Sequence, residues 1–488
     1  MKSGDSDAMK SRDALKSRVF SGVIWKFSER ILAYGVSFIV SVILARLLLP
    51  EEYGIVSLVL VFINLANVFV VSGFATALVQ NKNAADVDFS TNFYCGLALS
   101  VLIYAILFFA APWIAAFYAI PRLVPVLRVF ALRIPISSVS AIQHAYVERH
   151  MIFKRFFFST LFGTLLSGAA GIALAYAGFG VWALVAQYFT NTVVDILILG
   201  ITVPWRPRLL FSWASAKAMM RYGWKILAAD LSGTFFNYLR SLMIGRVYTS
   251  ADLAYYEKGT QFPGLIHSNL SSTIMTVLFP AIANVSEDRE RVKAMTRRAV
   301  QVTAYVMFPF LFGLAAVAEP LVLVLLTDKW AAAVPFVRIL SFSSAIGLIS
   351  DASLQSMKAI GRSDVVLRLE FVKKPVYVLL LLVGIRISVS AVAVTALVYS
   401  VYGTMMNARP LKKYLRYSYQ EQLSDLKIPA LLSCAMAGTI GLISFLHLGN
   451  LPMLVLQILT GAGFYIAASW ILKVDSLFYL LGYVPGLS

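Results

Sequence analysis

Glu51 and Glu52 form an adjacent pair of carboxylates in the stretch LARLLLPEEYG, which runs from Leu44 to Gly54. Two carboxylates can act as a general acid and a general base. Adjacent residues tend to point apart, however, so this pair is a poor start for that chemistry. Arg46 precedes the pair and lies in apolar sequence, where a charge is costly. What these side chains do depends on the element that holds them.

A second group of charged residues could bind an anion. Lys26, Glu29 and Arg30 are three and four residues apart, which places them on one face of a helix. Arginine offers planar, bidentate donors to a phosphate, and lysine offers a point charge. Lys26 and Arg30 therefore suit a pyrophosphate, whereas pairing with Glu29 would give them a structural role.

Other signals of catalysis or metal binding are weak. The histidines have no metal-ligand spacing: they are His144, His150, His267 and His447. No CxxC and no phosphate-binding GxxxxGK[ST] run occurs, so ATP-driven export by this chain is not expected. We expect no catalytic residue, no metal site and no cofactor, and hence no enzyme.

Composition decides the class of protein. Of 488 residues, 59% are hydrophobic and 14% are charged, whereas a soluble domain has about 25% charged residues. Apolar runs long enough to cross about 30 Å of hydrocarbon recur along the chain. Residues 1–18 are too polar for a secretory signal, so we expect the first apolar run to be a retained helix. We predict an all-α polytopic integral membrane protein with about 14 transmembrane helices.

The placement of the basic residues predicts the orientation. With a cytoplasmic N-terminus, the segments on that side hold 27 of the 42 Lys and Arg residues, and the opposite loops hold only Arg122, Lys329 and Arg386. This asymmetry is typical of cytoplasmic loops and places both termini in the cytoplasm. The net charge of +18 is therefore no sign of nucleic-acid binding.

An internal repeat predicts two lobes. "WK" at Trp25 and again at Trp224 is followed by an arginine, Arg46 and Arg246 respectively. From these arginines, RLLLPEEYG aligns with RVYTSADLA, and VPVLRV further on aligns with VPFVRI. Matches in one order indicate two six-helix lobes, and an even helix number makes them a parallel pseudo-two-fold repeat, as in transporters with a central site.

The predicted organisation follows from these boundaries. It is a cytoplasmic tail at 1–18, an N-terminal six-helix lobe at 19–202, a cytoplasmic connector at 203–221, a C-terminal six-helix lobe at 222–408, a cytoplasmic loop at 409–427, helices 13 and 14 at 428–473, and a C-terminal tail at 474–488.

Three features together resemble the Wzx-type oligosaccharide flippases, the polysaccharide-transport branch of the multidrug/oligosaccharidyl-lipid/polysaccharide exporter superfamily. They are the helix running into LARLLLPEEYG, the stretch ERHMIFKRF after the fourth helix, and fourteen spans in 6+6+2. Within that branch the chain looks similar to colanic-acid and succinoglycan exporters. The resemblance implies a MATE/MurJ-like fold and transfer of polyprenyl-pyrophosphate-linked sugar repeat units across the bacterial inner membrane.

The resemblance also implies partners. These are an undecaprenyl-pyrophosphate-linked oligosaccharide, membrane lipid, and, as protein partners in exopolysaccharide or lipopolysaccharide biosynthesis, a polysaccharide polymerase and a chain-length or export complex.

Polar stripes mark the candidate substrate site. They follow the predicted spans 2 (54–79), 7 (222–248) and 8 (254–283). The resembled family lines its central cavity with these three spans and span 1 (20–49). The residues that we expect to contact substrate in a cationic cavity are Lys26, Arg30, Asn64, Lys225, Asp230, Asn237, Arg240, Glu257 and Gln261. The alternative is that the stripes only hold helices together through interhelical hydrogen bonds.

The opening stretch is expected to be a periplasmic turn, in which Pro50 ends span 1 and Gly54 permits the reversal. Arg46 can then reach the surface and meet Glu51 or Glu52, as a structural pair or as a gate. Arg246 is assigned the same role in the second lobe. We also expect Lys258, Arg128 and Arg338 to lie near helix ends and to extend their charged groups to the membrane surface.

Two other functions compete with flipping. A cation or drug antiporter of the same superfamily would need an acidic cavity with an aromatic cage, and the basic excess in the spans argues against it. A membrane glycosyltransferase or polymerase would need a long extracytoplasmic loop, and the predicted periplasmic loops are short. A scaffold for polysaccharide assembly is a third alternative.

Overall fold

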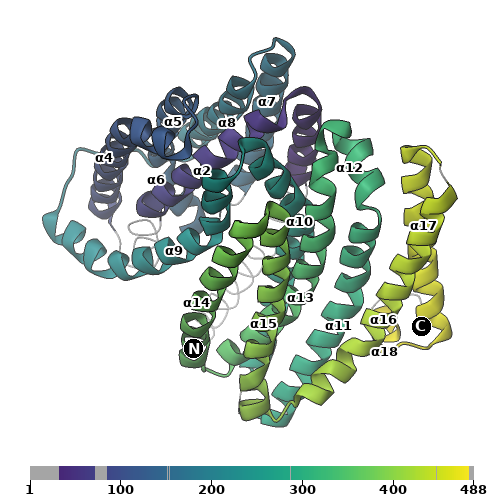
Figure 1. The fold of residues 1–488 in the computed structure, drawn as a ribbon. Helices are drawn as coiled ribbons and strands as arrows, with labels where there is room; N and C mark the ends of the chain where they lie inside the picture. The colour runs from purple at the N-terminus through teal and green to yellow at the C-terminus, as the bar shows by residue number, and fades with distance from the viewer. Residues whose placement is uncertain are drawn as a thin grey trace, which may run out of the picture. The chain divides into compact units, whose positions relative to one another are not determined.

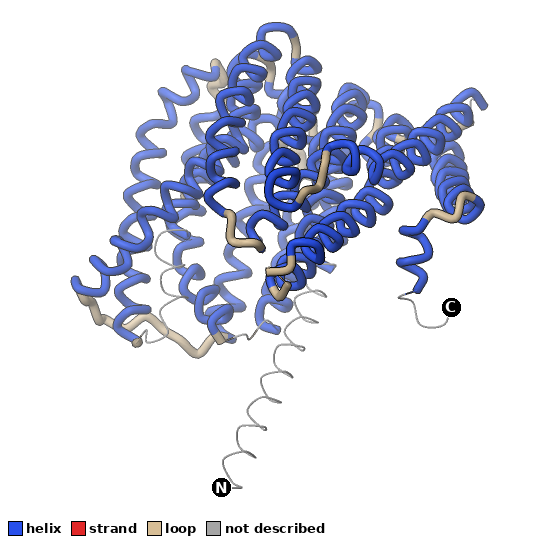
Figure 2. The backbone as a smooth tube through the Cα atoms, turned by 90° about the horizontal axis from the view of Figure 1, so that it is seen from below, coloured by secondary structure: helices blue, strands red, loops and turns tan. Residues whose placement is uncertain are grey.

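The computed structural model describes residues 32–71, 85–150, 152, 154–285, 287–446 and 448–482. This part of the chain is built of helices joined by short loops and contains no strand (Figure 2). The predicted all-α fold is confirmed. The chain divides into two compact units, residues 1–253 (unit 1) and residues 254–488 (unit 2).

Unit 1 begins, in the described part, with the helix Leu32–Leu47. It continues with α2 (Pro50–Val71), α4 (Asp86–Tyr118), α5 (Leu123–Ala131), α6 (Arg133–Arg149), α7 (Lys154–Tyr176), α8 (Val181–Thr202), α9 (Trp213–Val247) and the first turn of α10 (Ser250–Ala283). Helices α7 and α8 pack as neighbours, α2 packs against α9, and α4 packs against α6.

Unit 2 holds the rest of α10 and the C-terminal half of the chain. Its further elements are α11 (Arg289–Ala316), α12 (Ala318–Leu326), η1 (Asp328–Ala333), α13 (Val334–Ala359), α14 (Ser363–Ile387), α15 (Val389–Leu415), α16 (Tyr419–Ile443), η2 (Ser444–Leu446), α17 (Asn450–Ile471) and α18 (Asp475–Gly482). Helices α11, α13, α15 and α14 lie side by side, and α16 with α17 packs beside α11 and α12 (Figure 1).

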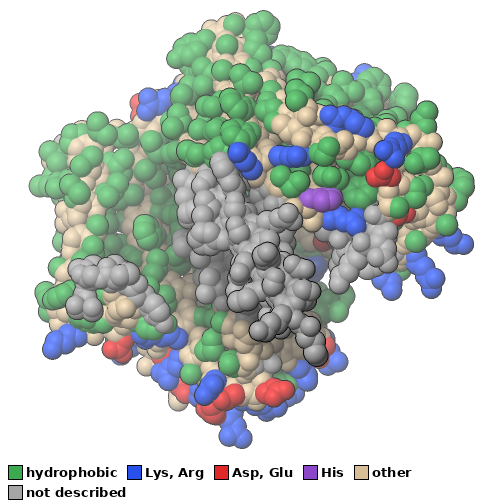
Figure 3. Space-filling view, turned by 180° about the vertical axis from the view of Figure 1, so that it is seen from behind, with side chains coloured by type: hydrophobic (Ala, Val, Ile, Leu, Met, Phe, Trp, Pro, Cys, Tyr) green, Lys and Arg blue, Asp and Glu red, His purple; other side chains and the backbone are tan. Residues whose placement is uncertain are grey.

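The helices have the length and composition of membrane spans. Ten of those described are long and apolar enough to cross a bilayer, and four more lie where spans are predicted: Leu32–Leu47, α9, α10 and α14. This pattern is consistent with about 14 spans. Large apolar side chains face outward, with Trp113 exposed by 74% and Phe310 by 60%, and they cover much of the surface seen in Figure 3. Lipid is the solvent that such a surface fits.

The boundary between the first two helices corrects the predicted turn. Pro50 begins α2, where its missing N–H costs nothing, and Gly54 lies inside the helix. Only Leu48 and Leu49 separate the two helices. The acidic residues occupy the first turn of α2, near its positive end. The expected reversal at Gly54 is therefore wrong.

The aligned repeats share this local geometry. The helix Leu32–Leu47 ends and α2 begins at residue 50, while α9 ends at Val247 and α10 begins at Ser250, 200 residues later. Glu52 accepts a hydrogen bond from the N–H of Leu49 at 2.9 Å. Its aligned counterpart, Asp252, accepts one from the N–H of Thr249 at 3.1 Å. Each carboxylate thus caps the start of its own helix and stands at the same spacing from the preceding arginine, Arg46 or Arg246.

The predicted loop at 409–427 is largely helical. Helix α15 continues to Leu415 and α16 starts at Tyr419, because Ser418 and Glu421 form a capping box. The start of α16 is fixed by Asp425, whose carboxylate receives two bonds from Arg297 at 2.6 and 2.8 Å. Tyr417 Oη adds a third bond at 2.8 Å. The buried carboxylate of Asp425 therefore ties α16 to Arg297 of α11.

Candidate functional site

The predicted substrate residues fall into three groups in the structure. Lys26 and Arg30 lie outside the described residues. Asn64 is on α2, and Lys225, Asp230, Asn237 and Arg240 are on α9. The third group, Glu257 and Gln261, is on α10.

Helices α2 and α9 bring part of this set together. The Nδ2 atom of Asn64 donates to the hydroxyl of Tyr238 at 2.8 Å, and Tyr238 lies between Asn237 and Arg240 in the sequence of α9. Arg240 is half-buried and Asn237 is exposed. Asn64 of the α2 stripe thus bonds to α9, at a residue that is not among the predicted site residues.

Asp230 is separated from this contact. It lies ten residues before Arg240 on one continuous helix, and a rise of 1.5 Å per residue puts the two about 15 Å apart along the axis. An ion pair between Asp230 and Arg240, one of the structural alternatives for Arg240, is therefore excluded. The side chains of Lys225 and Asp230 are both exposed.

On α10, Gln261 is engaged by a lysine. The Nζ atom of Lys258 donates to Gln261 Oε1 at 3.0 Å and lies 5.7 Å from the ring centre of Trp330. Lys258 is only 6% exposed. The expectation that Lys258 reaches a membrane surface is therefore wrong, because its ammonium is held among protein groups by a hydrogen bond and a cation–π contact. Glu257, its neighbour in sequence, is half-buried.

The residues assigned to helix ends have structural contacts. Glu52 caps α2, Glu51 is exposed beside it, and Arg46 is exposed at the end of the preceding helix. Arg246 lies with its guanidinium 4.9 Å from the ring centre of Phe117. A gating role for this group stays a prediction.

The arginines of the aligned VPVLRV and VPFVRI stretches also contact the preceding helical segments. The Nε of Arg128 donates to the carbonyl of Phe108 at 3.1 Å, and Arg338 pairs with Glu319 at 2.9 Å.

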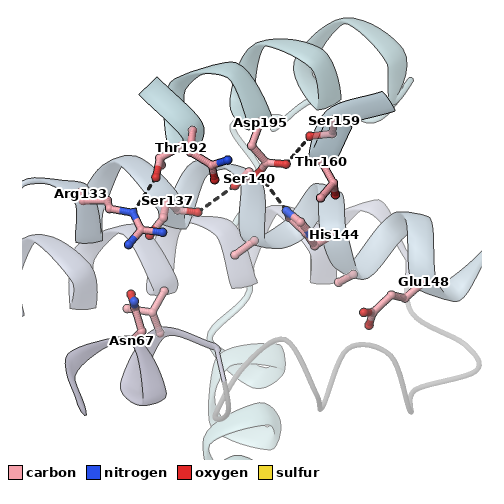
Figure 4. Close-up of a pocket in the computed structure, with 14 residues that line it drawn as sticks. Asn67, Arg133, Ser137, Ser140, His144, Glu148, Ser159, Thr160, Thr192 and Asp195 are labelled. Carbon is pink, nitrogen blue, oxygen red and sulfur yellow. Dashed lines mark hydrogen bonds and ion pairs between the residues drawn. The ribbon is translucent and has the colours of Figure 1, made fainter. Parts of the chain in front are cut away.

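Unit 1 contains a polar cavity that the sequence reading did not predict. Its volume is about 610 Å³, and α2, α6, α7 and α8 line it (Figure 4). The lining consists of Asn67, Val70, Arg133, Ser137, Ser140, Ala141, His144, Ala145, Glu148, Ser159, Thr160, Asn191, Thr192 and Asp195. A volume of this size is in the range of about 300–1,000 Å³ found for small-ligand sites.

A contact between His144 and Asp195 lies on one side of this cavity. The Nε2 atom of His144 lies 2.9 Å from a carboxylate oxygen of Asp195, and Ser159 donates to the other oxygen (Figure 4). The imidazole also stacks on Phe156, with ring centres 4.9 Å apart. The carboxylate of Asp195 is thus stabilised by His144 and Ser159.

Arg133 forms the other polar side. Its Nε donates to Thr192 Oγ1 at 2.6 Å, and its guanidinium lies 5.5 Å from the ring centre of Tyr188. No other hydrogen bond or ion pair of Arg133 occurs in the described part of the chain. Its two terminal nitrogens are therefore open to a ligand in the cavity.

One signal for this cavity was present in the sequence. Arg133, Ser137, Ser140, His144 and Glu148 recur at spacings of three and four residues, which gives α6 a polar face. Polar stripes are predicted on spans 2, 7 and 8, and this one is not among them. The contact between His144 of α6 and Asp195 of α8 cannot be predicted from a local pattern, because the two residues are 51 positions apart.

Unit 2 contains a similar pair. His267 Nε2 lies 3.2 Å from Asp351, and Ser271 donates to the same carboxylate at 2.7 Å. Two of the four histidines, which have no metal-ligand spacing in the sequence, thus pair with aspartates. Among the described residues, no group of three or more His, Cys, Asp or Glu side chains could hold a metal ion.

Comparison with known sequences identifies the relatives. Residues 43–335 match the family described as "Polysaccharide biosynthesis protein". The chain is 27% identical to the succinoglycan biosynthesis transport protein ExoT of Rhizobium meliloti over 347 residues, which are 71% of this chain and 70% of that protein. It is 22% identical to the lipopolysaccharide biosynthesis protein WzxC of Escherichia coli, with 86% of each chain covered.

Solved structures share the fold. The lipid II flippase MurJ in an inward closed conformation superposes with a TM-score of 0.75 at 16% identity, covering 94% of this chain and 100% of that one. An inward-facing MATE multidrug transporter has a TM-score of 0.60 at 15% identity, with 79% and 96% covered. The predicted MATE/MurJ-like fold is confirmed.

Proposed function

Because the chain belongs to the polysaccharide biosynthesis protein family and is similar to a succinoglycan transport protein, we propose that it is a transporter, not an enzyme, and flips a lipid-linked oligosaccharide. The substrate is a polyprenyl-pyrophosphate-linked repeat unit for exopolysaccharide or lipopolysaccharide synthesis, moved from the cytoplasmic to the periplasmic leaflet. The family match over residues 43–335 is the observation that carries the proposal. The names of the relatives support it, since they concern transport or biosynthesis of bacterial polysaccharides.

In the proposed mechanism, basic side chains bind the pyrophosphate in a cationic cavity. Lys26, Arg30, Lys225 and Arg240 supply the charge, and arginine adds a bidentate fork that fits phosphate oxygens. Alternating access then exposes the polar head to either side while the polyprenyl tail stays in lipid.

The polar groups Asn64, Asn237, Gln261, Asp230 and Glu257 are proposed to line the same path as the basic residues. A polymerase and a chain-length or export complex would receive the product.

Reconstitution tests the function directly. Fluorescently labelled undecaprenyl-pyrophosphate oligosaccharide is placed in proteoliposomes holding the full chain, and a membrane-impermeant quencher reports the outer-leaflet fraction. We expect the chain to make nearly all of the label accessible, against about half in protein-free liposomes. An unchanged accessible fraction would count against flipping, and uptake of the cation ethidium instead would favour the drug antiporter.

The proposed location is the bacterial inner membrane with both termini in the cytoplasm. Reporters fused after Arg208, Arg362 and Lys412 should read as cytoplasmic, because these positions belong to basic segments. Reporters fused after Tyr118 and Asn450 should read as periplasmic. Two reproducible inversions among these fusions would refute the orientation.

A further inference from the structure

The cavity of unit 1 differs in chemistry from the proposed pyrophosphate path. Its ionisable lining residues are Arg133, His144, Asp195 and Glu148, so the charges nearly balance. His144 and Asp195 already satisfy each other at 2.9 Å. A pyrophosphate needs an excess of positive charge, and this cavity does not provide one.

The remaining lining is rich in neutral hydrogen-bonding groups. Hydroxyls come from Ser137, Ser140 and Thr192, and side-chain amides come from Asn67 and Asn191. The hydroxyls bond to backbone or side-chain atoms nearby, for example Ser140 to the carbonyl of Ser137 at 3.1 Å. In contrast, neither amide has a hydrogen-bond partner among the described residues.

The two amides are free to bond to a ligand in the cavity. Each amide offers two donors and one acceptor oxygen, and both side chains are partly exposed. Asn67 comes from α2 (Figure 4). Asn191 comes from α8, so the two line the cavity from different helices. The terminal nitrogens of Arg133 add a third source of donors.

A ligand that matches this lining must carry many hydroxyls and little charge. Sugar rings have this chemistry, because each hydroxyl both donates and accepts. An apolar drug would make no hydrogen bond to the amides or to Arg133, whereas a sugar can bond to them and place its C–H faces on the apolar lining, which includes Val70, Ala141 and Ala145.

We propose that the cavity of unit 1 is a carbohydrate-binding subsite, which takes neutral sugar residues of the lipid-linked repeat unit while other residues hold the pyrophosphate. Asn67, Asn191 and Arg133 donate to sugar hydroxyls. This inference rests on the proposed function and adds to it that recognition of the sugar is separate from recognition of the pyrophosphate.

Two lipid probes separate the parts of the substrate. The first is undecaprenyl pyrophosphate that carries the host's own repeat unit, and the second is undecaprenyl pyrophosphate without sugar. Binding of each to the full chain in nanodiscs is measured for the wild type, for Asn67→Leu, for Asn191→Leu and for the double variant. Gln187→Leu is the matched control, because it makes the same change four residues before Asn191 on α8, outside the lining.

We expect each leucine variant to weaken binding of the glycosylated lipid about 3- to 10-fold and the double variant roughly 10- to 100-fold, as loss of hydrogen bonds predicts. Binding of the sugar-free lipid should stay at the wild-type value, and Gln187→Leu should change neither. If the leucine variants lose the wild-type elution profile, the smaller Asn67→Ala and Asn191→Ala replace them.

Three results would overturn the inference. Equal losses for both lipids would assign the cavity to the pyrophosphate or to folding, and unchanged binding of the glycosylated lipid would remove the cavity from the substrate path. If the wild-type chain binds neither lipid, the proposed function fails and the subsite fails with it.

Discussion

Gly54→Ala is expected to lower the membrane abundance and the unfolding temperature of the protein markedly. A Cβ atom at Gly54 would overlap the backbone carbonyl of Ser250, at the start of α10. A backbone cannot turn away as a flexible side chain can, so one helix must shift. Overpacking of this kind costs about 1–3 kcal/mol and occasionally more, and we expect the upper end of that range.

The matched control is the same substitution in an open place. A Cβ atom at Gly96, inside α4, would meet no atom within 4 Å. Gly96→Ala should therefore be neutral or stabilising by up to about 1 kcal/mol, because alanine favours a helix more than glycine does. Thermal unfolding of both purified variants in one detergent measures the two effects. An unfolding temperature of Gly54→Ala equal to that of the wild type would show that the contact with Ser250 is not tight.

This close approach was not readable from the sequence. PEEYG contains a proline, two acids and a glycine, which are turn residues as well as helix-start residues. The choice between the two depends on what packs against Gly54, and Ser250 is almost 200 residues away in the chain. The local sequence therefore predicts where one helix ends and the next begins. Long-range packing determines which role each residue has at that boundary.

The helices themselves followed from the sequence, because apolar length is a property of each segment alone. The alignment of Glu52 with Asp252 also pointed to a shared geometry, since both carboxylates cap a following helix. The cavity of unit 1 did not follow. Its lining combines residues of α2, α6, α7 and α8, and only the stripe on α6 can be seen in one segment. Pairing of His144 with Asp195 needs the packed fold.

Arg240→Gln is expected to abolish most export while leaving the protein abundant in the membrane. Arg240 is half-buried on α9, two residues after Tyr238, which receives the hydrogen bond of Asn64 at 2.8 Å. If Arg240 donates charge-assisted bonds to the pyrophosphate, its loss should cost about 1.5–3 kcal/mol of substrate interaction, or roughly 10- to 150-fold in affinity. Arg240→Lys should keep part of the function, because the charge survives while the bidentate fork is lost.

Membrane abundance, polysaccharide export and binding of undecaprenyl pyrophosphate are measured together for both variants. Arg221→Gln is the control, since Arg221 is exposed near the other end of α9 and should export normally.

Arg240 does not pair with Asp230, because about 15 Å of helix separates these two residues. Low membrane abundance of Arg240→Gln would therefore mean that the guanidinium makes a different structural contact. Normal export from a normally abundant Arg240→Gln would remove Arg240 from the substrate site. Reduced binding with normal abundance, partly restored by lysine, is the result that only a contact with the anionic headgroup explains.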